Sequence, residues 1–185
     1  MSLGSRRPPG GGVRYAVPAF IDATARRSVA YHFTIVTTMK FSFDKKLDHT
    51  VPPWVSEYAV FFITLCCAIR HRNTLAVPKI ADALFNGMKV YQEQRKWWVH
   101  IALLMPDHLH MLVSFSPFVA MDKTIADWKQ YQSRFLNIDW QRDFYDHRIR
   151  SDEQFMEKYE YIRMNPVRKN LAATPEDWQY VWQQK

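Results

Sequence analysis

Hydrophobic and polar residues follow one another along this chain in short blocks that predict strands alternating with helices. Compact apolar runs bounded by turn residues are typical of strands, and apolar residues at every third or fourth position are typical of helices. Strands are predicted at 58–69, 97–104, 108–115 and 144–150. Helices are predicted at 78–94, from Asp122 onward, at 151–165, and in a short C-terminal segment that runs from Thr174 and contains Trp178 and Trp182. This order predicts a small α+β sandwich with helices covering one sheet face.

The predicted helices carry end signals and core stripes. Pro78 suits a first helical turn, Asp122 can cap the second helix, and Ser151 with Gln154 fits a capping box. We expect Pro166 to end the third helix, because the residue before a proline is disfavoured in helical geometry. The core stripes are Ile80, Leu84, Met88 and Tyr91 in the first helix, Ile125, Trp128 and Phe135 in the second, and Phe155, Tyr159 and Ile162 in the third.

Residues 1–50 differ from the rest of the chain. They open with arginine, proline and glycine in a linker-like stretch, and only the segment 31–38 could form a strand, without an evident partner. Met39 is an alternative start of a shorter protein. We therefore expect a poorly ordered extension at 1–50 and a compact domain at 51–185.

Composition and charge exclude several classes of protein. The net charge of +7 is mostly in the extension, since residues 1–50 hold 8 Lys and Arg against 3 Asp and Glu, while residues 51–185 hold 17 against 15. Four of the 5 glycines lie in the first 12 residues, which leaves only Gly87, too few for a phosphate-binding or dinucleotide-binding loop. No apolar run reaches transmembrane length, and no secretory signal is evident. The adjacent Cys66 and Cys67 indicate two thiols in a reducing compartment, so we expect a cytoplasmic protein.

The first candidate for chemistry is the pair His108 and His110, which follows a Pro-Asp turn at the start of a strand. Alternate strand residues share a face, so both imidazoles point one way while Leu109, Met111 and Val113 point into the core. Two imidazoles on one face can bind one divalent metal ion. The alternative is an ordinary pair of polar side chains at the start of a strand.

The second candidate lies on the third predicted helix. Tyr161 is about a third of a turn away from the core stripe, and Asn165, four residues later, can share its face. A metal bound by two histidines and an oxygen ligand could polarise a phosphate, and a nearby tyrosine could attack that phosphate to form a phosphotyrosine. Tyr161 could instead be a surface aromatic, Asn165 a helix cap, and Arg70 and Arg72 part of a solvated loop.

Three stretches together resemble a known family. The segment 106–110 before an apolar strand resembles the histidine–hydrophobe–histidine (HUH) motif of single-strand DNA endonucleases. The segments 140–150 and 159–168 resemble the REP-associated branch of single-tyrosine transposases, and the resemblance covers about residues 56–180. Residues 1–50 match nothing in that pattern, and Asn170 stands where a glycine is frequent.

The resemblance implies a ferredoxin-like sandwich with a central antiparallel sheet and helices mainly on one face. It implies that His108 and His110 bind the metal with Asn165 as third ligand. Tyr161 is then the nucleophile, because it precedes Ile-x-x-Asn-Pro, and Tyr159 is the rival on the core stripe. We expect Mg²⁺ or Mn²⁺ as the cofactor.

The resulting expectation is a metal-dependent transposase that cuts and rejoins single-stranded or hairpin DNA. We expect it to be associated with the nucleoid and to bind no membrane, and a homodimer is a candidate oligomeric state. Candidate contacts to the DNA backbone, which set affinity and not sequence, are Arg70, Arg72, Lys129, Arg134, Arg163, Arg168 and Lys169. Two alternatives are a non-catalytic protein that binds nucleic-acid hairpins, and a metal hydrolase that uses a metal-bound water.

Overall fold

The computed structural model describes residues 48–52, 54–56 and 59–183. The predicted segment 31–38 lies outside the described residues. The strands are β1 (Val60–Cys66), β2 (Trp97–Met105), β3 (His108–Phe115), β4 (Tyr145–Arg148) and β5 (Val181–Gln183). The helices are α1 (Pro78–Glu93), α2 (Met121–Leu136) and α3 (Asp152–Arg168), with a 3-10 turn, η1, at Pro175–Asp177.

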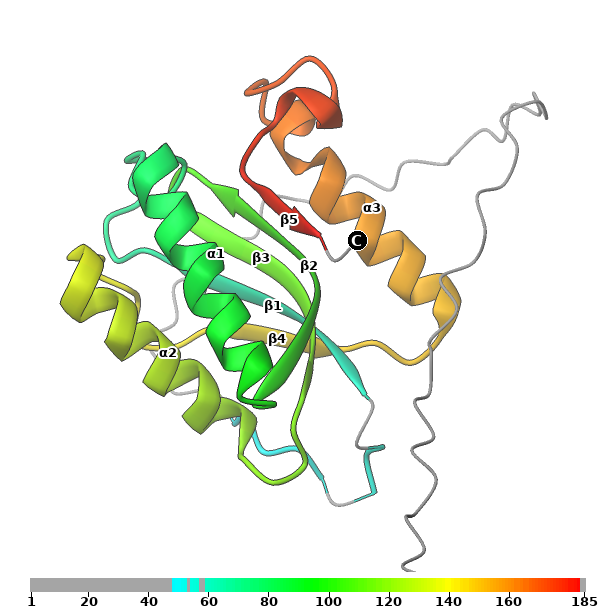
Figure 1. Ribbon diagram of the computed structural model, residues 1–185. Helices are drawn as coiled ribbons and strands as arrows, with labels where there is room; N and C mark the ends of the chain where they lie inside the picture. Colours follow the sequence, from blue (N-terminus) through cyan, green and yellow to red (C-terminus); the bar gives the residue numbers. More distant parts are fainter. Residues whose placement is uncertain (1–47, 53, 57–58, 184–185) are drawn as a thin grey trace, which may run out of the picture. The chain divides into compact units, whose positions relative to one another are not determined.

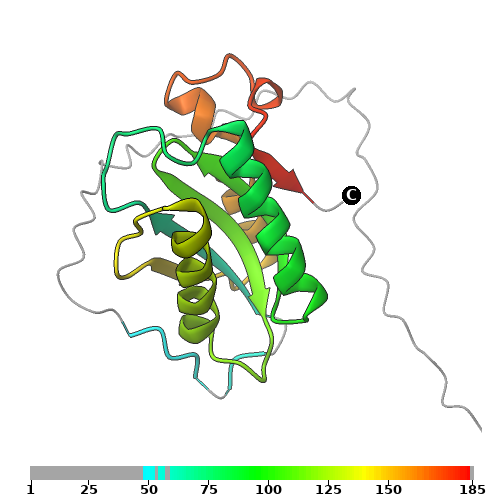
Figure 2. The same ribbon diagram turned by 60° about the vertical axis from the view of Figure 1, so that its left-hand side comes forward.

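A five-stranded antiparallel sheet in the order β4-β1-β3-β2-β5 forms the centre of the fold. Helices α1 and α2 cover one face of this sheet, and α3 lies against the other (Figures 1 and 2). The prediction of an α+β fold with helices mainly on one face is therefore confirmed, and the exception, α3, carries the candidate tyrosine.

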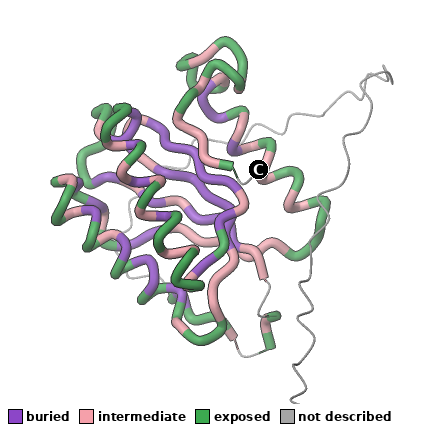
Figure 3. The backbone as a smooth tube through the Cα atoms, viewed as in Figure 1, coloured by how far each residue is buried: buried purple, intermediate pink, exposed green. Residues whose placement is uncertain are grey.

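The two faces of the sheet bury different cores. Under α1 and α2 lies the larger hydrophobic cluster, in which Ile63, Leu109 and Trp128 are fully buried. The smaller cluster, which includes Phe62, Leu112 and Ile162, lies under α3. Figure 3 shows the buried strands at the centre and exposed positions along the outer sides of the helices. The face under α3 therefore buries fewer hydrophobic residues than the face under α1 and α2.

The end of α3 differs from the prediction. The helix does not stop before Pro166 but continues through it to Arg168, and both Asn165 and Pro166 are buried. A proline inside a helix removes one backbone hydrogen bond, yet the last turn is held because the backbone N–H of Lys169 donates to the carbonyls of Asn165 and Pro166. Asn170 then adopts a left-handed conformation with φ of 55°, which explains why glycine would suit this position.

The predicted C-terminal helix is wrong beyond its first turn. Thr174 and Asp177 form a capping box, but only the 3-10 turn follows, and Trp182 lies on β5. The unpaired edge of β2 accepts this aromatic segment as a strand, with Leu103 opposite Val181. The indole N–H of Trp178 donates to the carbonyl of Leu104 at 3.0 Å and fixes the approach.

Two predictions on α2 are also corrected. Ala120, and not Asp122, is the N-cap residue, and Asp122 lies in the first turn. Phe135 is 68% exposed and packs against Tyr131, whose ring centroid is 4.5 Å away. Gln132 is the last buried residue of α2, and the helix ends with Asn137 in a left-handed conformation.

Ser151 is the N-cap residue of α3 as predicted, but the reciprocal bond of the predicted capping box goes to the N–H of Arg150 and not to that of Ser151. The hydroxyl of Ser151 accepts the N–H of Gln154, while the Gln154 side chain accepts the N–H of Arg150.

Among the helices that the structure describes, none is long and apolar enough to cross a membrane.

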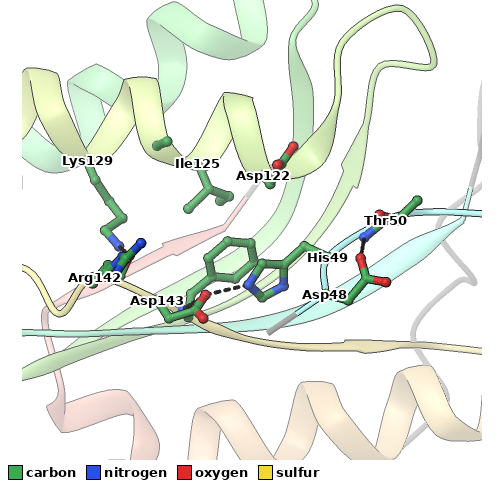
Figure 4. Close-up of a pocket in the computed structure, with 10 residues that line it drawn as sticks. Asp48, His49, Thr50, Asp122, Ile125, Lys129, Arg142 and Asp143 are labelled. Carbon is green, nitrogen blue, oxygen red and sulfur yellow. Dashed lines mark hydrogen bonds and ion pairs between the residues drawn. The ribbon is translucent and has the colours of Figure 1, made fainter. Parts of the chain in front are cut away.

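His49, which the sequence analysis assigns to the extension, is buried against the domain. Its ring stacks on that of Phe144, with the ring centroids 3.7 Å apart. Its Nε2 lies 2.5 Å from Oδ1 of Asp143, and its Nδ1 lies 2.6 Å from Oδ1 of Asp146. Figure 4 shows this imidazole directed at Asp143, below α2. The segment before residue 51 thus contributes at least one packed side chain to the fold.

We predict that deleting residues 1–38 leaves a stable and active domain, whereas deleting residues 1–50 destabilises it. The longer deletion removes the stacked His49 ring and its two hydrogen bonds to carboxylates, each of which is worth roughly 1.5–3 kcal/mol. Urea denaturation of both truncated chains measures the difference.

The point variant His49→Ala in the otherwise full chain serves as the matched control and should reproduce most of the loss. Equal free energies of unfolding for the two truncated chains would contradict the assigned role of His49.

Candidate functional site

The two histidines of β3 lie side by side on the sheet face that carries α3. Their ring centroids are 4.7 Å apart at an interplanar angle of 80°. Leu109, Met111 and Val113 are fully buried in the opposite core. The alternation predicted for this strand is therefore confirmed.

His110 is held from two directions. Its Nδ1 lies 2.8 Å from the hydroxyl of Thr64, the residue directly opposite on β1, and its ring stacks on Phe62 at 5.4 Å. With Nδ1 engaged, Nε2 is left for a ligand, which is how a second partner orients a metal-binding imidazole.

Burial keeps His110 neutral. It lowers the pKa of this imidazole well below the ordinary value of 6.5, the positive charges of His108 and Arg70 act in the same direction, and Asp107 partly opposes them. A neutral imidazole is the form that can bind a metal ion.

His108 is oriented by a buried carboxylate. Its Nδ1 lies 2.6 Å from an oxygen of Asp107, whose second oxygen accepts the N–H of His71 at 2.7 Å and lies 3.2 Å from Nε of Arg70. Burial alone would raise the pKa of Asp107, but these hydrogen bonds and the nearby positive charges outweigh it and hold the pKa far below its usual range. The ionised carboxylate fixes the His108 ring and places Arg70 beside it.

Tyr161 reaches the histidine pair from α3. Its ring centroid is 5.7 Å from that of His110 and 5.9 Å from that of Phe62. The guanidinium carbon of Arg168 lies 5.1 Å from the centre of the Tyr161 ring, and the ammonium of Lys158 lies 6.0 Å from it. A phenol, two imidazoles and two cations are thus gathered at one place.

The rival Tyr159 has different neighbours. Its ring stacks on Phe155 at 6.2 Å, and in the described part of the chain it makes no ring contact with either histidine. Both tyrosines are partly buried and pack against the smaller core, so distance from the core stripe does not separate them as predicted. The contact with His110 does separate them.

Asn165 lies one helical turn after Tyr161 and is buried. Of the hydrogen bonds that the described residues make, none uses its side-chain amide. Within residues 48–52, 54–56 and 59–183, no three His, Cys, Asp or Glu side chains converge as they would around a metal ion. Two oriented imidazoles nevertheless fit a divalent ion, and a third protein ligand would have to be of another type, such as an amide oxygen.

The predicted DNA contacts are divided by the sheet. Arg70 and Arg168 lie at the histidines and at Tyr161, while Arg163 is bound to Glu160 and Glu176. Lys129 and Arg134 lie on α2, across the sheet from Tyr161. The Lys129 ammonium donates to the carbonyls of Gln141 and Arg142, at 2.7 and 3.0 Å. Arg72 and Lys169 are exposed, in the loop after β1 and at the end of α3.

Sequence reasoning missed Thr64, Phe62 and the orienting role of Asp107. Alternation within the 58–69 run places Phe62 and Thr64 on one face, but only the pairing of β1 with β3 shows which histidine they meet. A polar pocket of about 460 Å³ lies on the other side of the sheet, near the start of α2, and is lined by His49, Lys129 and Asp143 (Figure 4).

The family model described as Transposase IS200 like matches residues 55–171. The chain is 21% identical over 136 residues, 68% of its length, to a REP-associated tyrosine transposase of Escherichia coli strain K12, of which it covers 81%. It is 35% identical over 148 residues to an uncharacterized protein of Haemophilus influenzae, where the match covers 58% of this chain and 79% of that protein. The fold is similar to that of a REP-associated tyrosine transposase solved with a bound REP hairpin, at a TM-score of 0.60 and 18% identity over 71% of this chain and 81% of the other.

We predict that His110 makes the domain less stable in mild acid. Because its pKa is lowered in the folded protein, the unfolded chain takes up a proton as the pH falls through 6.5 that the folded chain does not. The free energy of unfolding should fall with decreasing pH below 6.5, by up to about 1.4 kcal/mol per pH unit from this residue. Urea denaturation in chelator across this range measures the slope.

The variant His110→Leu should show a shallower slope than the unmodified chain. His71→Ala, at an exposed loop position, is the matched control and should keep the original slope. Identical slopes in the unmodified chain and in His110→Leu would contradict the assignment.

Proposed function

The chain belongs to the IS200-like transposase family, and on that premise we propose that it cuts and rejoins single-stranded or hairpin DNA through a phosphotyrosine. The observation that carries the proposal is the position of the Tyr161 ring, 5.7 Å from His110 and beside the His108–His110 pair. Tyrosine is a nucleophile that forms covalent intermediates, and a covalent link conserves the energy of the cut bond for rejoining.

In the proposed reaction the hydroxyl oxygen of Tyr161 attacks the scissile phosphate. A bond forms between this oxygen and phosphorus, and the bond from phosphorus to the 3′ oxygen breaks. The phenolic proton leaves, the departing 3′ oxygen gains a proton, and the products are a 5′-phosphotyrosine and a free 3′-hydroxyl. Attack by a different 3′-hydroxyl reverses the step and joins new ends. The cation of Arg168 supports this role, since it can face the phosphate charge. Lys158 also lies near Tyr161, but its ammonium is paired with Glu157 at 3.0 Å.

His108, His110 and the amide oxygen of Asn165 would hold the divalent ion, Mg²⁺ or Mn²⁺. When bound, the ion supplies Lewis-acid polarisation of a phosphate oxygen. Asp107 and Thr64 act by fixing the two imidazoles through Nδ1, so that both Nε2 atoms stay available. Burial of His110 keeps that ligand deprotonated.

The proposed partner is DNA with a hairpin, in line with the hairpin bound by the structurally similar transposase. Arg70 and Arg168 are the best placed of the predicted backbone contacts, and Arg72, Arg163 and Lys169 join them in the proposal. Lys129 and Arg134 stay predictions that the geometry around Tyr161 does not support. A homodimer also stays a prediction.

We predict that Tyr161→Phe abolishes the covalent protein–DNA complex and leaves folding and DNA binding nearly unchanged, because it removes only the hydroxyl. The measurement is trapping of labelled single-stranded or hairpin DNA on the protein under denaturing conditions. A binding protein without catalysis would give no complex from the unmodified chain, and a hydrolase would give free 5′ ends.

Tyr159→Phe is the matched control and should form the complex at close to the original rate. Loss of the complex in Tyr159→Phe together with normal activity in Tyr161→Phe would reverse the assignment of the nucleophile.

We predict that His108→Ala and His110→Ala each abolish cleavage, and that excess chelator does the same. Asn165→Ala should weaken metal binding less, since water can replace a neutral amide oxygen.

Thr64→Val should lower metal affinity or activity by roughly 10- to 100-fold through loss of the hydrogen bond to His110. Mn²⁺ should bind more tightly than Mg²⁺, because Mg²⁺ prefers oxygen ligands.

Calorimetric titration with Mn²⁺ and Mg²⁺ separates the effects on affinity from those on chemistry, with His71→Ala as the control histidine. Full cleavage in excess chelator would refute the metal site.

A further inference from the structure

One half of the sheet face around Tyr161 is not accounted for by the proposed reaction. Helix α3 packs mainly on β2 and β3, whereas β4 forms the edge of the sheet on the far side of β1. The part of this face that β1 and β4 build therefore lies next to the candidate site. It is not part of the main contact surface of α3.

Three side chains of the β4 segment point to this face. Tyr145 is paired with Thr64 and His147 with Phe62, and directly opposite residues of an antiparallel pair share a face. Ile149, two residues further on, packs against the same core as Phe62. We call Tyr145, His147 and Ile149 the β4 track.

The track is continuous with the candidate active site. The centroid of the Phe62 ring lies 5.9 Å from that of Tyr161, 5.4 Å from that of His110 and 6.1 Å from that of Tyr145. One aromatic side chain thus contacts the proposed nucleophile, the histidine pair and the track. Whatever is bound at Tyr161 and extends toward β4 would pass over Tyr145 and His147.

The far end of the track opens into a hollow of about 420 Å³ between β4 and the start of α3. Ile149, Arg150, Asp152 and Phe155 line it. Arg150 is exposed there, and Arg168 stands at the Tyr161 end. The two rings of the track, Tyr145 and His147, together with these arginines are complementary to bases and their phosphate backbone.

The side chains of the track are partly exposed. Tyr145 and His147 are both half-buried. In the part of the chain that the structure describes, no hydrogen bond, ion pair or ring contact engages the His147 imidazole. Residues two apart on a strand are about 7 Å apart, which is about two steps of stacked bases.

We propose that the β4 track binds the unpaired DNA strand next to the scissile phosphate, with the rings of Tyr145 and His147 stacking on its bases. This inference rests on the proposed function and adds to it the surface that selects a single-stranded flank. Stacking on side chains requires unpaired bases, so the track would favour DNA whose flank is not in a duplex.

The first test measures binding by the full-length chain carrying Tyr161→Phe, which prevents turnover. Two fluorescent probes are compared by anisotropy: a DNA hairpin with a short single-stranded extension and the same hairpin without it. Tyr145→Ala and His147→Ala should each weaken binding of the extended hairpin about tenfold and leave the plain hairpin little changed. Tyr145→Phe and His147→Phe, which keep a ring, should bind the extended probe nearly as the parent does.

Tyr131→Ala is the matched control, since it removes an exposed tyrosine from α2 on the opposite side of the sheet. Unchanged binding in both track variants, an equal loss for both probes, or no preference for the extended probe in the parent would overturn the proposal.

The second test does not depend on how the variants fold. Bromodeoxyuridine is placed in the extension, the complex with the full chain is irradiated, and the cross-linked peptide is identified by mass spectrometry. Cross-links to Tyr145 or His147 support the track, and cross-links confined to α1 or α2 overturn it. The proposed function is judged separately from the track. Binding and cross-linking on the track without a covalent adduct at Tyr161 would refute the phosphotyrosine alone. Adduct formation without any effect of the track variants on binding would refute the track alone.

Discussion

Strand β1 pairs with β3 in a register that sets Thr64 opposite His110 and Cys66 opposite His108. A slip of one residue would turn every side chain of β1 to the other face of the sheet. Phe62 and Thr64 would then enter the core under α1 and α2, and His110 would lose both its stacking partner and its hydrogen bond. Strand β1 also pairs with β4, where Thr64 is opposite Tyr145, so the position of β1 determines where Tyr145 lies. The site therefore depends on correct sheet pairing before it depends on any single catalytic group.

The larger core holds that register in place. Leu65, Leu109 and Met111 are fully buried beneath α1 and α2, and burial of such a side chain contributes about 1.5–3 kcal/mol. The opposite face is less apolar, because it gives positions to Thr64, His108 and His110. Stability on one side of the sheet thus allows a polar arrangement on the other, where α3 brings Tyr161 against the histidine pair.

Local patterns in the sequence predicted much of this arrangement. Alternation along β3 placed His108 and His110 on one face, and the capping residues located the start of α3. Predictions failed where hydrogen bonding, within a helix or between strands, overrode a simple sequence rule. Pro166 does not end α3, because the last turn keeps its backbone hydrogen bonds, and Trp182 joins a strand because β2 offers an unpaired edge. The partners of the histidines could be named only in part: Asp107 is adjacent in sequence to His108, whereas Thr64 is 46 residues away from His110. The choice between Tyr159 and Tyr161 likewise depends on a contact with another element, His110 on β3.

The identity of the residue that becomes attached to DNA tests the account most directly. Lys158 and Arg163 flank both candidate tyrosines, so trypsin releases residues 159–163 as one peptide. After reaction with DNA and nuclease digestion, fragmentation of this peptide by mass spectrometry shows which tyrosine carries the nucleotide. The account predicts a nucleotide linked through its 5′ phosphate to Tyr161 and an unmodified Tyr159. A nucleotide on Tyr159, or an unmodified peptide in a sample that has cut its DNA, would contradict it.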